Sequence, residues 1–452
     1  MAALATIREW RNSFIPINRI PLDVLPLIPI HLSQMDRFHA SFVCRRWRRT
    51  FLHHAPLWSQ LYLIRGEAYV KTLLERAKGS VLTVAASCAD TVGAMTLLSP
   101  HNKQIKEIDF VYSHWPDIQM FSDINSGPFP LLCTLVIEVF KGINPDTPNA
   151  TSPPSPPLFR NAVKVETFVL RSETLPFLNR FVFPNLTGFH LEALAEAGFP
   201  ALQLLDFLEG SPMLETAYIK IVGGVLLEGV RPERIVVLPD LKMFSLAVSD
   251  GGRGYEVAAH ISCPSAKRAS FTHMQFIGDV NPQGMFPTPD LWNTIARQYT
   301  KSQTEVVILE VKIAEDPLVR CSLSFYVSGE PIIDFNFSVI GYGEEEDTDP
   351  FMVPLVREVY CEVFVQAIKI IGGYPLLAGV GLLHIYHSFF VFSSAQVTSI
   401  GNEIGRTFRR MGHLEELTIH CCDIRPYLAP FLNSSGSYRF EQPVSFPHVT
   451  NS

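Results

Sequence analysis

Charged side chains are scarce in this 452-residue chain. Asp, Glu, Lys and Arg supply 18% of the residues, against about 25% in an average soluble protein, whereas 47% are hydrophobic. A chain of this length and composition can bury a large core, so the sequence excludes general disorder. The net charge of −7 also excludes a global attraction to nucleic acid or to an anionic membrane.

Signatures of catalysis and of cofactor binding are missing as well. The chain contains no G-x-x-x-x-G-K-[ST], no G-x-S-x-G and no H-E-x-x-H motif. His384 and His387 lie three residues apart in an expected strand, so they point to opposite faces and cannot easily share a metal. The acidic stretch Glu344–Asp349 is interpreted as a solvated turn. We therefore expect no catalytic residue, no metal and no cofactor, and a protein that is not an enzyme.

Cysteine spacing and the N-terminal residues give no sign of secretion. The eight cysteines are scattered and form no C-x-x-C pair, which favours reduced, buried thiols over a disulfide framework. The first twenty residues contain arginines and no uninterrupted apolar core. The uncharged stretch Ile370–Asn402 is broken by Pro375 and several glycines, which favours a turn and a buried strand over a membrane span. We expect an intracellular protein of the cytoplasm, the nucleus or both.

The most distinctive stretch of the chain lies between residues 20 and 58. It begins with Ile-Pro and an apolar run, continues with the pentad Val-Cys-Arg-Arg-Trp at 43–47, and closes with Leu-Trp at 57–58. Val43, Trp47 and Phe51 are spaced i, i+4, i+8 and predict one apolar stripe on a helix. Three short helices bury little apolar surface by themselves, so they must pack on the rest of the chain or on a partner.

Two residues set the expected ends of these helices. Asp36 is a candidate N-cap of a short helix that carries Phe38 and Phe42. Pro29 lies too deep in the preceding helix for its missing N–H to be tolerated, so we expect the helix to kink or end there.

This combination of motifs resembles the F-box, the small helical module that docks substrate receptors onto the Skp adaptor of cullin-RING ubiquitin ligases. The resemblance implies binding to a Skp-type adaptor and, through it, to cullin and RING subunits. It also implies that a set of residues either contacts the adaptor or holds the contacting helices in place. These residues are Pro21, Val24, Leu25, Ile28, Leu32, Val43, Cys44 and Trp47.

The charge of this region suits an acidic partner. Residues 1–65 contain nine arginines and three carboxylates, a balance of +6, which leaves −13 for the remainder. The run Arg-Arg-Trp-Arg-Arg at 45–49 could also be interpreted as a nuclear signal or a nucleic-acid patch. We favour the helical interpretation because Trp47 and the apolar stripe already account for the spacing.

A six-residue pattern with apolar side chains at positions 1, 4 and 6 recurs through the rest of the chain. Over the first seven copies the starts are 21 to 33 residues apart, which is within or close to the period of leucine-rich repeats. The copies are IKEIDF (105–110), LCTLVI (132–137), VETFVL (165–170), LTGFHL (186–191), LETAYI (214–219), LKMFSL (241–246), AKRASF (266–271), VVILEV (306–311), VGLLHI (380–385) and LEELTI (414–419).

This recurrence predicts an α/β chain in which strand–helix units stack on one another. Each unit exposes an apolar edge that only the next unit can cover. A doubly wound parallel sheet would also alternate strands and helices, but it gives no reason for the strand motif to repeat. We therefore expect a small helical F-box followed by a curved leucine-rich-repeat-like solenoid with a parallel strand face. The organisation resembles F-box proteins with degenerate leucine-rich repeats, of the type abundant in mushroom-forming fungi.

The sequence predicts three regions and two insertions. The regions are an N-terminal segment (1–19), the F-box (20–64) and the repeat domain (65–452). One insertion is the Pro/Ser/Thr-rich stretch 144–157, and the other spans about 286–354 and contains an antiparallel elaboration with strands at 305–313, 319–327 and 332–341. Helices are expected at 354–372 and 396–412.

The C-terminal residues predict an incomplete end. Ser445–Thr450 repeats the lead-in seen at Phe183–Thr187, so a further strand is expected to begin where the chain stops. Because solenoid ends normally carry a polar cap, we expect an exposed apolar edge here and a chain shorter than its relatives.

These observations favour a substrate receptor of an SCF-type ubiquitin ligase, with a protein substrate that the sequence does not identify and with no nucleic acid or membrane partner. The alternative is an interaction scaffold outside a ligase; a hydrolase or transferase lacks any supporting motif. Residues that alternate with the inward apolar positions point to the open strand face. The candidates for substrate contact on this face are Gly188, His190, Thr216, Tyr218, Met243, Ser245, Arg268, Ser270, Glu416 and Thr418.

Overall fold

The computed structural model divides the chain into two compact units. The first comprises residues 1–172 and 180–183, and the second comprises residues 173–179 and 184–452. The structure describes residues 6–7, 10–11, 14–22, 24–87, 92–113, 115–139, 158–173, 177–249, 251–276, 290–291, 294–295, 308–316, 318–327, 330–340, 382–387, 394–409 and 416–421.

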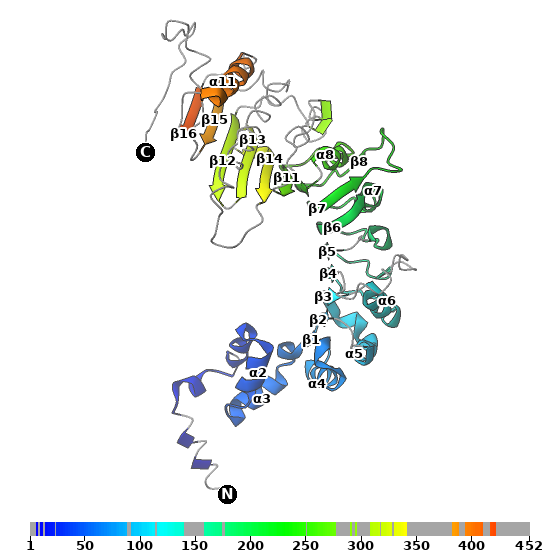
Figure 1. Ribbon diagram of the computed structural model, residues 1–452. Coiled ribbons are helices and arrows are strands. Elements are labelled where there is room, and N and C mark those ends of the chain that lie inside the picture. The colour runs from blue at the N-terminus through cyan, green and yellow to red at the C-terminus, as the bar shows by residue number, and fades with distance from the viewer. Residues whose placement is uncertain are drawn as a thin grey trace. The chain divides into compact units, whose positions relative to one another are not determined.

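Short helices occupy the N-terminal part of the first unit (Figure 1). The expected first helix is split into two 3-10 turns, the second of which begins at Pro29, so the predicted break is confirmed. The cause is local, because Pro26 and Pro29 both lack the N–H that a continuing helix needs. The elements are η1 (Pro16–Arg19), η2 (Leu25–Leu27), η3 (Pro29–His31), α2 (Gln34–Ser41), α3 (Arg45–His53) and η4 (Ala55–Trp58).

Two sequence predictions about these helices are wrong. Ser33, not Asp36, caps α2: the Ser33 hydroxyl accepts from the Asp36 amide at 3.2 Å and donates to the Asp36 carboxylate at 2.6 Å. Asp36 therefore lies in the first turn of α2, where its carboxylate accepts from the capping hydroxyl and its negative charge is favoured. The apolar stripe begins at Trp47, because Cys44 is extended and α3 starts only at Arg45. Val43 precedes the helix and is exposed.

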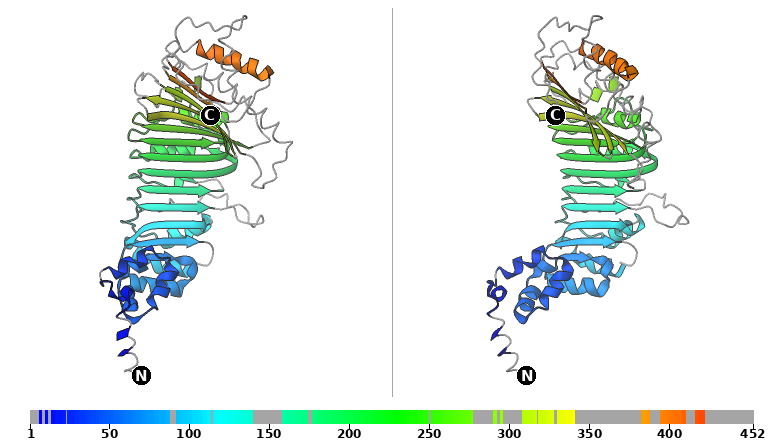
Figure 2. Two further views of the ribbon diagram at one scale, coloured as in Figure 1. Left: turned by 90° about the vertical axis from the view of Figure 1, so that its left-hand side faces the viewer. Right: turned by 60° about the vertical axis from the view of Figure 1, so that its left-hand side comes forward.

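The strands of the first unit form a parallel sheet in chain order. Neighbouring strands pair from β1 to β5, as Figure 2 shows. Helices α4, α5 and α6 lie on one side of these strands (Figure 1). The elements are β1 (Gln60–Tyr62), η5 (Leu63–Arg65), α4 (Glu67–Ala77), β2 (Leu82–Ser87), α5 (Val92–Leu98), η6 (Ser99–Gln104), β3 (Ile105–Ser113), α6 (Trp115–Ile124), β4 (Thr134–Val139) and β5 (Thr167–Ser172). The short η7 (Leu178–Arg180) contains residues of both units.

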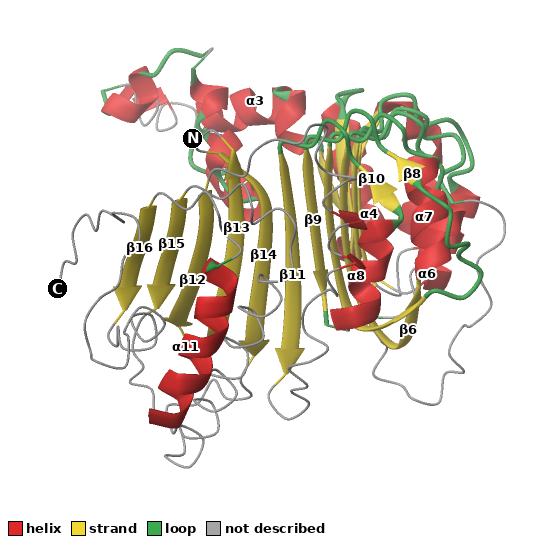
Figure 3. Cartoon of the chain, turned by 90° about the horizontal axis from the view of Figure 1, so that it is seen from above, coloured by secondary structure: helices red, strands yellow, loops and turns green. Residues whose placement is uncertain are grey.

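The second unit continues with parallel strands and then an antiparallel insertion (Figure 3). Strands β6, β7, β9 and β11 pair in parallel, and β11 pairs in parallel with β14. Strand β13 lies between β12 and β14 and pairs antiparallel with both, which confirms the predicted elaboration. Strand β12 then pairs in parallel with β15, and β15 with β16.

The second unit also contains a separate two-stranded parallel ladder, β8–β10. The elements of the unit are β6 (Gly188–Pro200), α7 (Ala201–Glu209), β7 (Thr216–Leu226), β8 (Val236–Val237), β9 (Met243–Val248), α8 (Gly251–Ala259), β10 (Ile261–Ser262), β11 (Arg268–Phe276), β12 (Ile308–Asp316), β13 (Leu318–Val327), β14 (Glu330–Ile340), β15 (Leu382–His387), α11 (Ser394–Phe408) and β16 (Glu416–Cys421).

The six-residue motifs all coincide with strands, and five of them share one backbone contact. Except in IKEIDF, the strand begins at the third motif position. In these five motifs, the amide at the second position donates to the carbonyl of the second residue in the preceding motif, so each is stacked on its predecessor with the same geometry. These bonds are Cys133 to Lys106 (2.9 Å) and Glu166 to Cys133 (2.9 Å) in the first unit, and Glu215 to Thr187, Lys242 to Glu215 and Lys267 to Lys242 (2.8 Å each) in the second.

The core of each unit lies on the sheet face that the helices cover. The fourth and sixth motif residues are buried in every copy from 105 to 271. In the second unit these include Phe189, Leu191, Phe244 and Phe271, and Phe189 stacks on Phe207 of α7 at 4.6 Å between ring centroids. Burial on one face and exposure on the other follow from the two-residue period of a strand.

Several predictions fall outside the described residues. These are the Pro/Ser/Thr-rich stretch, the acidic loop, the helix at 354–372 and the C-terminal edge. The helix predicted at 396–412 is confirmed by α11. Within the described part of the chain, no helix is long and apolar enough to cross a membrane.

Candidate functional site

Large apolar side chains are exposed on the short N-terminal helices. Their elements pack together, since η2 contacts η3 and α3, and α2 contacts α3. Between residues 20 and 58, Phe42 and Val43, directly after α2, are the most exposed, at 67% and 64%. Exposed apolar patches on a soluble domain usually mark interaction sites. The exposed residues are Leu22, Val24, Leu27, Met35, Phe42 and Val43.

The residues that the F-box resemblance nominated fall into two groups. Pro21, Val24 and Val43 are exposed and available to a partner, whereas Leu25 and Trp47 are buried and hold the helices together. The remaining three, Ile28, Leu32 and Cys44, are half-buried.

Sequence reasoning missed four exposed apolar residues, Leu22, Leu27, Met35 and Phe42. A signal was present for two of them. Leu22 and Leu27 belong to an apolar run that is too dense for short 3-10 turns to bury on one side. Phe42 was placed inside a helix, but it is the residue at which α2 ends.

Arg37 ties the short helices to one another from inside. Its side chain is 6% exposed and donates to the Pro29 carbonyl at 2.8 Å, the Leu57 carbonyl at 3.1 Å and the Gln60 side-chain oxygen at 3.2 Å. Burial lowers the pKa of this guanidinium. One charged side chain therefore joins η3, η4 and the start of β1, and each acceptor would lose one hydrogen bond without it.

Aromatic side chains complete the core of these helices. Trp47 packs on Phe51 with 5.2 Å between ring centroids, and the Trp58 indole N–H donates to the Phe51 carbonyl at 2.8 Å. The Arg48 guanidinium lies 5.2 Å from the centre of the exposed Phe42 ring. Phe42 is therefore held beside a cation while its other side stays open to a partner.

The second unit presents rows of side chains on the sheet face opposite its core. Strand register places His190, Tyr218, Ser245 and Ser270 side by side, because each is the Cα partner of the next. The rings of His190 and Tyr218 are 4.5 Å apart, and His190 also contacts Glu192 at 3.0 Å. Burial and, to a smaller extent, Glu192 raise the pKa of Tyr218, so its hydroxyl stays a hydrogen-bond donor.

A second row on this face holds the other nominated residues. Gly188, Thr216, Met243 and Arg268 are partners in register, and none of the four is buried. Register also places Glu416 and Thr418 opposite Leu382 and His384 of β15. The side chains of β16 lie outside the described part, so the structure brings together eight of the ten nominated residues.

The corresponding face of the first unit carries an acidic group of side chains. Glu107 and Asp109 lie on β3, and Glu138 of β4 forms an ion pair with Arg171 of β5. Burial, then the charges of Glu138 and Glu107, raise the pKa of Asp109, while Arg171 opposes them. The two units therefore present strand faces of different chemical character.

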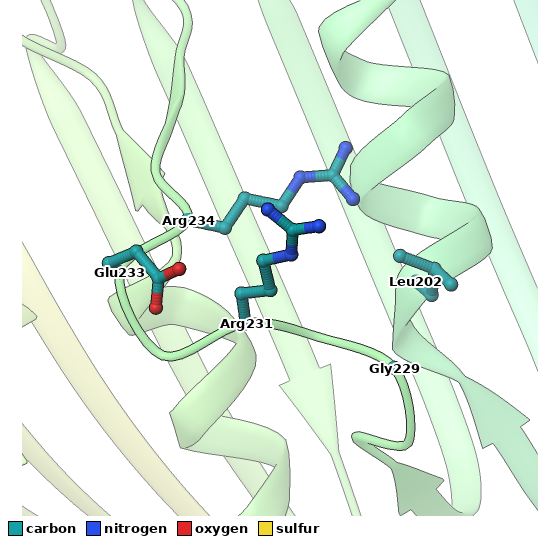
Figure 4. Close-up of a pocket in the computed structure, with 5 residues that line it drawn as sticks. All are labelled: Leu202, Gly229, Arg231, Glu233 and Arg234. Carbon is teal, nitrogen blue, oxygen red and sulfur yellow. The ribbon is translucent and has the colours of Figure 1, made fainter.

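A cavity of about 440 Å³ lies beside α7 in the second unit (Figure 4). Its lining includes Leu202 from the helix and Gly229, Arg231 and Arg234 from the segment that follows β7. Arg234 is already bound to two carboxylates of α7, Asp206 at 2.8 Å and Glu209 at 2.5 Å. Arg234 thus links α7 to the segment after β7 by ion pairs, and Arg231 and Glu233 add one charge of each sign to the lining.

Within the described residues, no group of three or more His, Cys, Asp or Glu side chains could hold a metal ion. The features that stand out among the described residues are surfaces. They are the exposed apolar side chains of the N-terminal helices and the open strand faces of the two units.

Comparison with protein families identifies one of these regions. The model of the F-box domain matches residues 17–58, which include η2, α2, α3 and η4. F-box domains generally bind Skp-type adaptors and suggest a substrate-adaptor role in SCF ubiquitin ligases. No curated protein matches the chain.

Proposed function

We propose that this chain is the substrate-recognition subunit of an SCF-type cullin-RING ubiquitin ligase and is not itself an enzyme. The observation that carries the proposal is the F-box domain at residues 17–58, together with its exposed apolar residues Phe42 and Val43. The Skp-type adaptor would bury these side chains and connect the chain to cullin and RING subunits. Such a complex acts inside the cell, in the cytoplasm or the nucleus.

The exposed and the buried residues of the F-box would have different roles in adaptor binding. Exposed side chains such as Val24 and Val43 would contact the adaptor, because burying them removes apolar surface from water. Buried side chains such as Leu25 and Trp47 would set the positions of the contacting ones. The arginines of α3, among them Arg45 and Arg49, add positive charge that favours an acidic adaptor surface.

The test is capture of the purified full-length chain by a recombinant Skp-type adaptor. Val43→Asp should weaken binding by about 30-fold or more, because it places a carboxylate in an apolar contact. This corresponds to a loss of about 2 kcal/mol of binding free energy, as at an interface hot spot. Val182→Asp is a matched control, since Val182 also lies in the first unit and is 63% exposed against 64% for Val43. Equal binding by Val43→Asp and the parent chain would contradict the docking surface.

We further propose that the strand–helix units are degenerate leucine-rich repeats forming a solenoid, of the type found in fungal F-box proteins. The recurrent hydrogen bond at the second motif position supports this, because repeats must stack with one geometry. The domain boundaries that follow are 20–64 for the F-box and 65–452 for the repeats. The open strand faces would then bind the substrate protein.

Substrate contact is proposed for two rows of the second unit. The His190–Tyr218 pair offers an aromatic surface with hydrogen-bonding groups, and the neighbouring row adds Met243 on β9 and Arg268 on β11. Replacing His190 and Tyr218 by Ala should reduce binding of ubiquitin-ligase substrates captured with the parent chain, and it should leave adaptor binding unchanged. Loss of adaptor binding in this variant would contradict the division of roles between the two surfaces.

A further inference from the structure

The first strand–helix unit contributes a charged side chain to the F-box core. Arg76 lies on α4, which begins nine residues after the end of the matched segment at Trp58. Its guanidinium carbon is 4.8 Å from the centre of the Trp58 ring and 5.4 Å from that of Phe38. The two rings are themselves 5.0 Å apart, so the cation faces a pair of F-box aromatics.

The hydrogen bonding of Arg76 supports this contact. Its Nη1 atom is buried and has no hydrogen-bond partner among the described residues. A buried guanidinium nitrogen without an acceptor is costly, unless the negative faces of aromatic rings take the place of one. Trp58 is fully buried and Phe38 is half-buried, so the rings occupy the positions where acceptors or water would otherwise be needed.

Other contacts join the same elements. Tyr69 of α4 lies 6.0 Å from Phe38 between ring centroids. The Ser59 carbonyl, directly after η4, accepts from the Thr83 amide of β2 at 3.0 Å. Since β1 begins at Gln60, no linker separates the last F-box helix from the sheet. Helix η4 also contacts α4.

We infer that the adaptor-docking module of this chain extends through α4, and that Arg76 is a positioning residue for it. Arg76 holds Trp58 and Phe38, Trp58 donates to the Phe51 carbonyl, and Phe51 packs on Trp47 of α3. Phe38 lies on α2, four residues before the exposed Phe42. Removing the cation would therefore loosen the helices that present the exposed apolar residues. This inference rests on the proposed adaptor binding.

The test uses the full-length chain with Arg76→Ala, Arg76→Lys and Lys71→Ala. Lys71 is the matched control, because it is a cation on the same helix but is exposed to solvent. Two quantities are measured: the affinity for a recombinant Skp-type adaptor, and amide hydrogen exchange of residues 45–58 in the adaptor-free chain.

The expected result is a loss of adaptor affinity of about tenfold in Arg76→Ala, with faster exchange at residues 45–58. Arg76→Lys should recover part of the adaptor affinity and part of the protection from exchange, because it keeps the cation. Lys71→Ala should match the parent chain in both quantities. Parent-like affinity in Arg76→Ala would overturn the inference, whatever its exchange. If the parent chain does not bind the adaptor, the proposed function fails, and exchange alone decides whether α4 completes the F-box.

Discussion

Arg37 is the residue on which the arrangement of the N-terminal helices depends most directly. A buried guanidinium that donates to three acceptors takes one hydrogen bond from each of them when it is removed. Arg37→Ala should therefore lower the free energy of unfolding by about 3 kcal/mol, as for other broken buried charge networks. Arg49→Ala, an exposed change on α3, should alter it by less than about 0.5 kcal/mol.

Urea denaturation of the full-length chain, followed by tryptophan fluorescence, measures the free energy of unfolding of both variants. Equal stability of the two would show that the Arg37 hydrogen bonds contribute nothing net to the fold. The sequence did not indicate this role, because two of the three acceptors are backbone carbonyls, which are the same in every residue.

Asp109 should make the first unit less stable as pH rises. Its pKa is raised above the ordinary value of 3.8 by burial, Glu138 and Glu107, so the folded state holds the proton more tightly than the unfolded state does. The stability from this proton is complete below the ordinary pKa and is lost as pH rises through the raised one.

Asp109→Asn removes the charge and keeps the shape. It should raise the melting temperature at pH 7, and the gain should shrink as pH falls toward 4. Thermal unfolding at several pH values checks this. If the increase in melting temperature is the same at every pH, the ionised carboxylate of Asp109 is not destabilised by burial and by its acidic neighbours.

At the scale of elements, helix–strand packing depends on close backbone approach at one glycine. A Cβ at Gly254 of α8 would lie 2.6 Å from the Cβ of Val248 on β9, a contact that neither backbone can relieve without moving. Gly254→Ala should cost about 1–3 kcal/mol from overpacking, and this exceeds the gain of about 1 kcal/mol in helix propensity.

Gly93→Ala on α5 is the matched control. There a Cβ would meet only the end of the flexible Glu67 side chain, at 2.8 Å, so this change should be neutral or slightly stabilising. Chemical denaturation of both variants checks the pair. A stabilised Gly254→Ala variant would show that α8 does not pack on β9 at this distance.

Elements were predictable where a local pattern determines them. The alternation of apolar residues located the strands at LTGFHL, LETAYI and LKMFSL, and Pro29 located the break in the first helix. The cap of α2 was not predictable, since Ser33 and Asp36 are both good capping residues and only the chain path selects one. The prediction that Val43 shares an apolar stripe with Trp47 and Phe51 was wrong, because Cys44 is extended and the helix begins only after it.

The candidate site was only partly predictable for a related reason. Strand alternation indicated which face of β6, β7 and β9 is open, because every second side chain points away from the helices. The pairing of Arg76 with Trp58 and Phe38 joins residues far apart in sequence. No local pattern predicts such a contact.

At the scale of the whole molecule, the F-box should not be separable from the sheet that follows it. A fragment of residues 60–452 would lose the rings that face Arg76 and Tyr69 on α4. Its first thermal transition should fall below that of the full-length chain, and its α4 amides should exchange faster. An unchanged transition would show that the F-box is an independent domain. Point variants are therefore better controls for adaptor binding than this truncation.

The central claim is that the exposed apolar residues of the N-terminal helices bind a Skp-type adaptor. Hydrogen exchange of the full-length chain with and without the adaptor tests it most directly, because exchange locates the contact on the chain. The account predicts protection in residues 20–45, where Val24, Phe42 and Val43 lie, and no change in β6, β7 and β9. Protection of those strands with none in residues 20–45 would contradict it.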